Sequence, residues 1–220
     1  SGTGAKTIQS SVATSAALIS KTSGIVQVSN SAIIDVNATG GASFRYDALS
    51  TLTRSTGWTL GGTMYWGNSA GNWTATGPTK WYSETNSGGA VYTAVPAATD
   101  IVVFDASSAS CVLDAAATCQ ALTMTGYAGT VSGTGTLSIA GSWTQAGVWS
   151  ATGTVSIVGT GTLTQGAASI SCPITINGSG ITCTLGSALN IGTKTLSLTA
   201  GTFDIGANYQ VNCAIFSGTG

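Results

Sequence analysis

Few residues in this chain could do chemistry. Its 220 residues contain no histidine, which excludes a Ser-His-Asp or Cys-His nucleophile system and any histidine-ligated metal. Asp100 and Asp105 flank a predicted strand, but a separation of five places their side chains on opposite faces. Turn and strand-end roles suit both residues better, so we predict no catalytic pair here.

Three other carboxylates could gather on one face of a repeating β structure. They are Asp105, Asp114 and Asp204. Polysaccharide lyases built this way usually also need a cationic base, and beyond Trp81 the chain offers only Lys194. We therefore expect no enzyme activity, no catalytic residue and no cofactor.

The cysteines are odd in number, far apart and without a C-x-x-C pair. This spacing argues against a zinc site or a complete disulfide framework, although one disulfide is left open. We expect most of them to be small apolar fillers of strand interiors. They are Cys111, Cys119, Cys172, Cys183 and Cys213.

Five residues are candidates for contact with a carbohydrate or a partner. Trp66, Trp73 and Trp81 could form a platform on which sugars stack, or they could fill the core of a cap. Arg45 and Tyr46 lie in a segment that combines charge with aromatic rings. Arg45 and Asp47, two apart in a presumed strand, share a face and could form a surface ion pair or bind a partner.

Composition narrows the class of protein. Lys and Arg total 6, Asp and Glu total 7, and charged residues make up 6% of the chain against roughly 25% in most soluble domains. So few cations cannot supply the phosphate contacts of a nucleic-acid binder. With 43% hydrophobic residues the chain should fold, yet no window is apolar enough for membrane insertion. No signal peptide is visible at the start of the sequence.

The chain divides into three regions. Residues 1–59 contain short extended segments, such as 17–19, 25–28 and 32–36, separated by small polar turns. Residues 60–106 are rich in aromatic residues and loops, as expected of a cap or connector that covers one end of a stack. Residues 107–220 repeat a Gly/Lys-Thr-apolar-Ser/Thr-apolar template, in which apolar and small polar residues alternate as in a half-buried strand.

The repeat favours an all-β fold, a parallel β-solenoid (β-helix) with an aromatic-rich cap. Leu137, Val155, Ile174 and Leu196 are 18, 19 and 22 residues apart, which indicates coils of about twenty residues and about five coils after residue 107. The alternative is a β-sandwich, but the Asn-Gly and Asp-Gly turns typical of antiparallel hairpins are scarce. The residues expected to point inward are Leu122, Val131, Leu137, Ile139, Val155, Ile157, Leu163, Ile174, Ile176, Leu185, Leu196, Leu198, Phe203 and Ile205.

Several stretches together suggest a family. They are 65–67 with 71–73, 81–83 with 87–90, 95–96 with 100–105, 119–126 and 194–204. The chain resembles a Gly/Ser/Thr-rich β-solenoid repeat found in structural and appendage proteins of tailed bacteriophages and in related bacterial surface proteins. The likeness covers nearly the whole chain, and the aromatic block is its specific part. The resemblance implies that residues 1–59 are the closing strands or coils of a preceding solenoid unit. It also implies a virion or cell-surface building block and brings no catalytic residues.

Three functions follow as expectations. The first is a non-enzymatic component of a virion appendage or surface, such as a fibre or a head or tail decoration, that could help attach to a host. The second is a bacterial surface adhesin or extracellular filament subunit, and the third is a polysaccharide-binding or polysaccharide-cleaving β-helix protein. The expected location is the virion surface or the extracellular space, or else the bacterial cell surface.

The expected partners follow from the open ends of a solenoid. We expect other copies of the chain or neighbouring virion or filament proteins, together with a cell-surface glycan. Unpaired coil ends are normally covered. Either the chain is a segment of a longer polypeptide, or residues 8–36 of one copy continue the stack left open near residues 211–216 of another.

Overall fold

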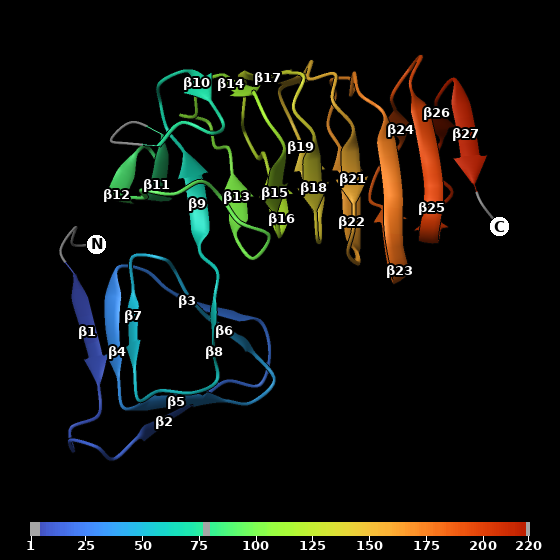
Figure 1. Ribbon diagram of the computed structural model, residues 1–220. Coiled ribbons are helices and arrows are strands. Elements are labelled where there is room, and N and C mark those ends of the chain that lie inside the picture. The colour runs from blue at the N-terminus through green and yellow to red at the C-terminus, as the bar shows by residue number, and fades with distance from the viewer. Residues whose placement is uncertain (1–4, 77–79, 219–220) are drawn as a thin grey trace.

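The chain forms two stacks of parallel strands joined by a single crossing segment (Figure 1). The computed structural model describes residues 5–76 and 80–218, and no helix occurs among them. The predicted all-β parallel solenoid is therefore confirmed. We expected the stack to continue beyond both ends of the sequence. That expectation partly concerns residues 1–4 and 219–220, which lie outside the described residues.

Strand direction decides against the β-sandwich. Among the described strands, antiparallel pairing occurs only where β11 (Trp81–Glu84) meets β9 (Thr63–Trp66) and β12 (Gly88–Val91). The other pairings join one coil to the next in parallel. A stack of coils gives this pattern, because each pass of the chain runs in the same direction as the pass below it.

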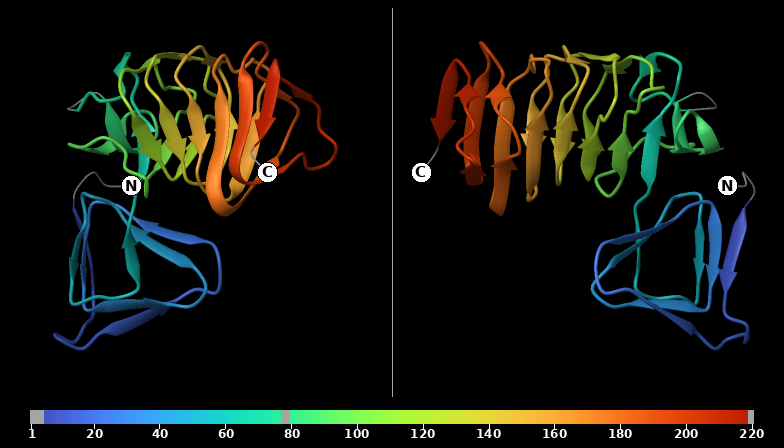
Figure 2. Two further views of the ribbon diagram at one scale, coloured as in Figure 1. Left: turned by 45° about the vertical axis from the view of Figure 1, so that its right-hand side comes forward. Right: turned by 180° about the vertical axis from the view of Figure 1, so that it is seen from behind.

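The first stack is three-sided, and Figure 2 shows its triangular outline. Its sides are β1 (Lys6–Gln9), β4 (Ser31–Ile34) and β7 (Thr51–Thr53); β2 (Ala17–Ser20) and β5 (Val36–Thr39); and β3 (Ile25–Val28), β6 (Ser43–Tyr46) and β8 (Trp58–Leu60). The expected single segment over 32–36 is wrong. Asp35 has a φ of +54°, a left-handed conformation that aspartate tolerates, and it turns the chain between β4 and β5.

A small core fills this triangle. Its buried hydrophobic residues are Ile33, Val36, Ala38, Phe44 and Trp58. The Phe44 and Trp58 rings meet edge to face with centroids 5.4 Å apart, and Trp58 Nε1 donates a hydrogen bond to the Val36 carbonyl at 3.0 Å. The polar end of the indole is thus satisfied inside the core.

The second stack is also three-sided, and its sides are named A, B and C here. Side A holds β9, β13 (Ile101–Val103), β16 (Ala121–Thr123), β19 (Trp143–Gln145), β22 (Gly161–Gln165) and the second halves of β23 (Ile174–Leu185) and β25 (Thr195–Asp204). Side B holds β10 (Gly71–Asn72), β14 (Cys111–Leu113), β17 (Thr130–Gly133), β20 (Val148–Trp149), β24 (Leu189–Asn190) and β26 (Val211–Asn212). Side C holds β15 (Ala117–Cys119), β18 (Leu137–Ile139), β21 (Val155–Ile157), the first halves of β23 and β25, and β27 (Ile215–Gly218).

The register of side C matches the spacing in the sequence. Leu137 pairs with Val155, Val155 with Ile174, and Ile174 with Leu196, so each predicted interval is one coil. Segment 60–106 also contributes to this stack, since β9 and β13 lie on side A and β10 lies on side B. The aromatic region is therefore the first part of the second stack and carries the β11–β12 hairpin as an insertion.

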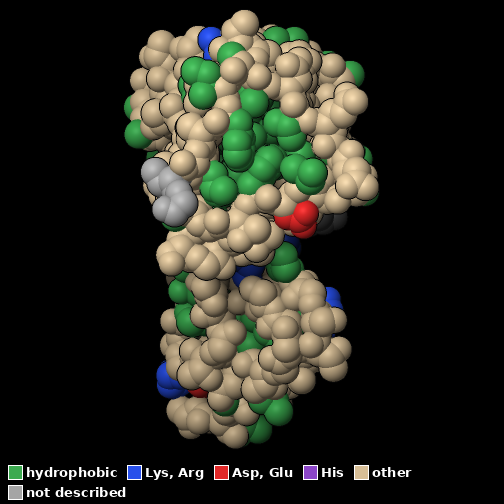
Figure 3. Space-filling model, turned by 90° about the vertical axis from the view of Figure 1, so that its right-hand side faces the viewer, with side chains coloured by type: hydrophobic (Ala, Val, Ile, Leu, Met, Phe, Trp, Pro, Cys, Tyr) green, Lys and Arg blue, Asp and Glu red, His purple; other side chains and the backbone are tan. Residues whose placement is uncertain are grey.

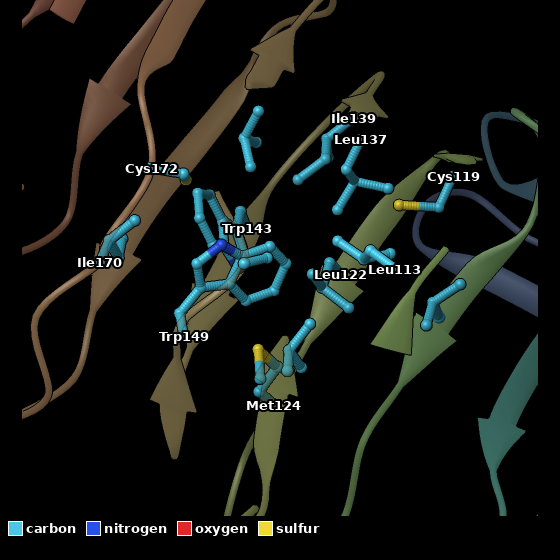
Figure 4. Packing of buried hydrophobic residues seen from close by; sticks show 14 of the residues in the cluster. Leu113, Cys119, Leu122, Met124, Leu137, Ile139, Trp143, Trp149, Ile170 and Cys172 are labelled. Carbon is cyan, nitrogen blue, oxygen red and sulfur yellow. The ribbon is translucent and has the colours of Figure 1, made fainter. Parts of the chain in front are cut away.

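The apolar positions of the strands fill the interior of the second stack. Figure 4 shows the rings of Trp143 and Trp149 together, and their centroids are 4.9 Å apart. Most of the predicted inward residues are buried: Leu122, Val131, Leu137, Ile139, Val155, Ile157, Leu163, Ile174, Ile176, Leu185 and Leu196. Leu198 and Phe203 are half-buried. The prediction for Ile205 is wrong, because this side chain follows the last described strand of side A and is 45% exposed.

The cysteines behave as expected of apolar fillers. All five are free, and Cys111, Cys119, Cys172 and Cys183 are buried. Burial raises the pKa of Cys119 to about 12 and that of Cys183 to about 11. Since a thiolate is the reactive form, these thiols are unreactive near neutral pH.

Candidate functional site

An aromatic hairpin covers the first strand of side A. Strand β11 runs antiparallel along β9, with Trp81 opposite Trp66 and Tyr82 opposite Tyr65. The hairpin turns at Asn86 and Ser87, whose φ angles are +55° and +54°. Because β9 pairs with β13 on its other edge, the hairpin reverses the strand direction and ends the parallel ladder there.

The three candidate tryptophans form the interior of this cap. Trp66, Trp73 and Trp81 are 1%, 2% and 0% exposed. Trp81 lies edge to face with both other rings, at 4.9 Å from Trp66 and 5.0 Å from Trp73, and Phe104 packs against all three. No face of these rings is open to a sugar, so the platform interpretation does not fit this structure. The rings fill the irregular end of the stack instead.

Lys80 covers the outside of the same cluster, and the sequence analysis did not single it out. Its ammonium lies 5.6 Å from the centre of the Trp66 ring, within range of a cation–π contact. It also donates to the Ala70 carbonyl at 2.7 Å and to the Ser69 carbonyl at 3.3 Å. Lysine beside an aromatic block is the one sequence signal that could have indicated this role.

The carboxylates of the second stack hold turns and, at Asp114, join neighbouring coils. Asp105 accepts hydrogen bonds from the Ser107 amide at 2.8 Å and the Ser107 hydroxyl at 2.6 Å. Asp114 accepts from the Thr74 amide at 3.1 Å, and Asp204 from the Gly206 amide at 2.9 Å.

These three carboxylates do not meet. Asp105 follows β13 and Asp204 ends β25, five strands further along side A, which is roughly 24 Å at the usual strand spacing. Asp114 follows β14 on side B. Burial alone would raise the pKa of Asp105, but its hydrogen bonds from Ser107, Asn86 and Ser108 hold it below the ordinary value.

The junction between the stacks contains the other two candidates, Arg45 and Tyr46. Arg45 is 6% exposed, and its Nη2 donates to the carbonyl of Thr99 in the second stack. Tyr46 is half-buried and packs against the core of the first stack. The expected surface pair of Arg45 with Asp47 is wrong: Asp47 is fully buried, and the described ion pair of the chain joins Arg54 to Asp35.

Asp47 instead joins the two stacks. It accepts a hydrogen bond from the Tyr92 hydroxyl at 2.8 Å, and within the first stack it accepts from the Asn30 amide at 3.1 Å and the Ser50 hydroxyl at 2.6 Å. Burial, reinforced by the charge of Asp47, raises the pKa of Tyr92 far above its usual range. Tyr92 therefore stays protonated near neutral pH and can donate this hydrogen bond.

Asp100 fixes the loop that meets Arg45. It accepts from the Gly62 amide at 2.7 Å and from the Ala97 amide at 2.8 Å. The turn role predicted for Asp100 is confirmed. Its second function, holding the crossing segment at Gly62, was not predicted, because 38 residues separate the two groups in the sequence.

A groove runs along this junction and is named the junction groove here. It encloses about 360 Å³, and its lining includes Ile25, Ser43, Arg45, Thr59, Thr99 and Gln120. One wall is the outer surface of β3, β6 and β8, and the other is the loop before β13 with the corner at Gln120. In this groove the buried cation Arg45 borders an open volume between the two stacks.

No family model, curated protein or solved structure matches this chain. Within the described residues there is no helix of the length and apolar character that crossing a bilayer requires.

Proposed function

We propose that this protein is a non-enzymatic structural component of a virion appendage or surface, such as a fibre or a head or tail decoration. The observation that carries the proposal is the parallel pairing of strands from coil to coil within each stack. Repeating main-chain hydrogen bonds make such a stack stiff along its axis, as a spacer or fibre element requires. The resemblance of the aromatic block to phage appendage repeats supports the virion context.

The outward residues of side C suit a building block. A column of small hydroxyl side chains stacks in register along six strands: Thr118, Ser138, Ser156, Thr175, Ser197 and Ser217. Ser217 donates to the Ser197 hydroxyl at 3.0 Å. Charged residues stacked at a strand spacing of about 4.8 Å would repel, whereas hydroxyls can bond along the column. The near absence of charge thus follows from the coil geometry.

The far end of the second stack supports an assembly role. Figure 3 looks at this end and shows hydrophobic side chains gathered in its centre. Ile205, Ile215 and Phe216 are 45%, 56% and 57% exposed. Such a surface is unfavourable in water and suits contact with β structure that continues the ladder. We propose that β structure continuing the ladder covers it, either from a longer polypeptide or from another copy or a neighbouring virion or filament protein.

Mass spectrometry of purified virions, compared with the secreted fraction of the same culture, tests this function. We expect the chain in the particle fraction, in a fixed ratio to the major structural proteins. Recovery only from the secreted or cell-wall fraction would contradict the proposal and favour the surface adhesin or filament subunit.

A further inference from the structure

We infer that the junction groove binds a carboxylate-bearing saccharide and that Arg45 is the residue that binds its carboxylate. The inference deepens the proposed surface role, because a virion or cell-surface component meets glycans. It concerns a different part of the molecule from the aromatic cap. It depends on the state of Arg45, on the chemistry of the groove wall and on the groove's size.

Arg45 is a buried cation with little compensation. The side chain is 6% exposed, and the hydrogen bond described for its guanidinium goes to a neutral acceptor, the Thr99 carbonyl. A guanidinium has five N–H donors, so one carbonyl leaves donors that can bond to water or to a ligand in the groove. Burial lowers the pKa of Arg45 and the charge of Asp100 opposes this, but the net direction is downward. The charge is therefore incompletely balanced.

An anion in the groove would supply the missing balance. Burying a charge is costly unless the charge is paired, so a ligand carboxylate at Arg45 gains more than it would at an exposed arginine. The planar fork of a guanidinium matches the two oxygens of a carboxylate in a bidentate pair. A neutral ligand could not make this contact.

The rest of the groove suits a sugar ring. Ser43 and Thr59 present hydroxyls and Gln120 presents an amide, which can exchange hydrogen bonds with sugar hydroxyls. Ile25, 52% exposed, offers an apolar surface for the C–H face of a ring. A volume of about 360 Å³ lies at the small end of the range for ligand sites, so we expect one or two sugar residues to be held.

Titration calorimetry of the full chain with digalacturonate tests the inference, with neutral digalactose and inorganic phosphate as comparison probes. We expect digalacturonate to bind at least about tenfold more tightly than digalactose and than phosphate. Equal binding of the acidic and neutral sugars, or no binding of either, would overturn the inference. Phosphate binding as tightly as digalacturonate would also overturn it, since the groove would then be a simple anion site.

Three variants make the test specific. Arg45→Gln should weaken digalacturonate binding by about tenfold or more, while Lys6→Gln, which removes a positive charge at an exposed position of the first stack outside the groove, should leave it unchanged. Ser43→Trp should fill the groove while keeping the Arg45 charge, since Ser43 is exposed and lines the groove. If Arg45→Gln alters folding, Ser43→Trp still decides: unchanged binding in that variant contradicts the site. The presence of the chain in virions would be unaffected by failure here.

Discussion

The two stacks turn their corners by different means. In the first stack, Asn30, Asp35 and Arg54 adopt left-handed backbone conformations, with φ of +48°, +54° and +48°, although they are not glycines. In the second stack, every described residue with positive φ between Gly126 and Gly206 is a glycine. The first stack thus keeps side chains at several left-handed positions beside Gly24, Gly40 and Gly57, whereas the coils of the second stack use glycine at these positions up to Asn208.

The side chains kept in the first stack hold its coils together. Asp35 accepts from Arg54 Nε and Nη2, both at 2.7 Å, and from the Thr14 amide at 3.1 Å. These three residues belong to three successive coils, so one carboxylate joins the whole stack. The second stack instead relies on a long apolar core. The small first stack therefore depends on a few polar contacts, whereas the larger second stack distributes its stability over stacked hydrophobic columns.

The largest effect should come from the core of the second stack. Replacing Trp143, which is fully buried against Trp149, by alanine should lower the free energy of unfolding by about 3–5 kcal/mol. Denaturant unfolding measures this, and hydrogen exchange should show the loss confined to the second stack. Val158→Ala, at a 40% exposed position, is the control. A loss below about 1 kcal/mol for Trp143→Ala would contradict the conclusion that the second stack depends on its apolar core.

The second-largest loss of stability should come from a substitution at a glycine corner of the second stack. Gly133 has a φ of +104°, and a Cβ there would lie 2.3 Å from the Leu113 carbonyl oxygen of the coil below. Gly133→Ala should therefore cost more than the roughly 1–3 kcal/mol of backbone strain alone. Gly180→Ala is the matched control, because Gly180 has a φ of +73° but no atom near its Cβ position. Equal losses of thermal stability would show that close packing of coils adds nothing to the cost.

Removing one oxygen atom should weaken the contact between the stacks. Tyr92→Phe removes the hydroxyl that donates to buried Asp47, at a cost of about 1–3 kcal/mol. Hydrogen exchange should increase around residues 43–47 and 92–100. Tyr209→Phe, in the second stack, is the control and should change neither. An unchanged Tyr92→Phe variant would mean that the Tyr92–Asp47 hydrogen bond does not help to position the stacks.

The sequence predicted the second stack better than the first. Alternation of apolar and small residues, repeated at intervals near twenty, was sufficient to identify the strands and the register of Leu137, Val155, Ile174 and Leu196. Period-two patterns report burial within one strand and repeat length reports stacking, so both signals are local or periodic.

Contacts between distant and dissimilar residues gave no such signal. Tyr92 and Asp47 are 45 residues apart, and Arg45 became buried because another stack packs against a face that looks exposed in its own strand. The buried pair Gln145 and Gln165 was also missed. Each amide satisfies backbone groups at a corner of the stack, a role that polar residue type alone does not indicate. The hairpin of the cap was missed because its aromatic residues show no period.

The acid sensitivity of the two stacks should differ modestly. The hydrogen bond from Arg54 holds the pKa of Asp35 below its ordinary value of 3.8. The ionised carboxylate therefore stabilises the first stack above that value, and this contribution is lost as the pH falls through the lower folded-state pKa. In Asp35→Asn the first stack should melt earlier at neutral pH and lose less stability on acidification. Melting curves across this pH range, with Asp204→Asn as control, would show whether Asp35 has this role.

The smallest effect should come from the carboxylates of the second stack. Replacing Asp105, Asp114 and Asp204 together by asparagine keeps an oxygen that can accept the turn hydrogen bonds from Ser107, Thr74 and Gly206. Asp204 accepts from the Gly206 amide within its own turn, whereas Asp105 and Asp114 also accept from the more distant Asn86 and Thr74 amides. Because none of the three joins three coils as Asp35 does, the melting temperature should change less than in Asp35→Asn. Particle assembly and attachment should be unchanged. The decisive measurement is polysaccharide cleavage by particles carrying the triple variant. Cleavage that is present in the parent and lost in the variant would overturn the structural interpretation and assign these acids to catalysis.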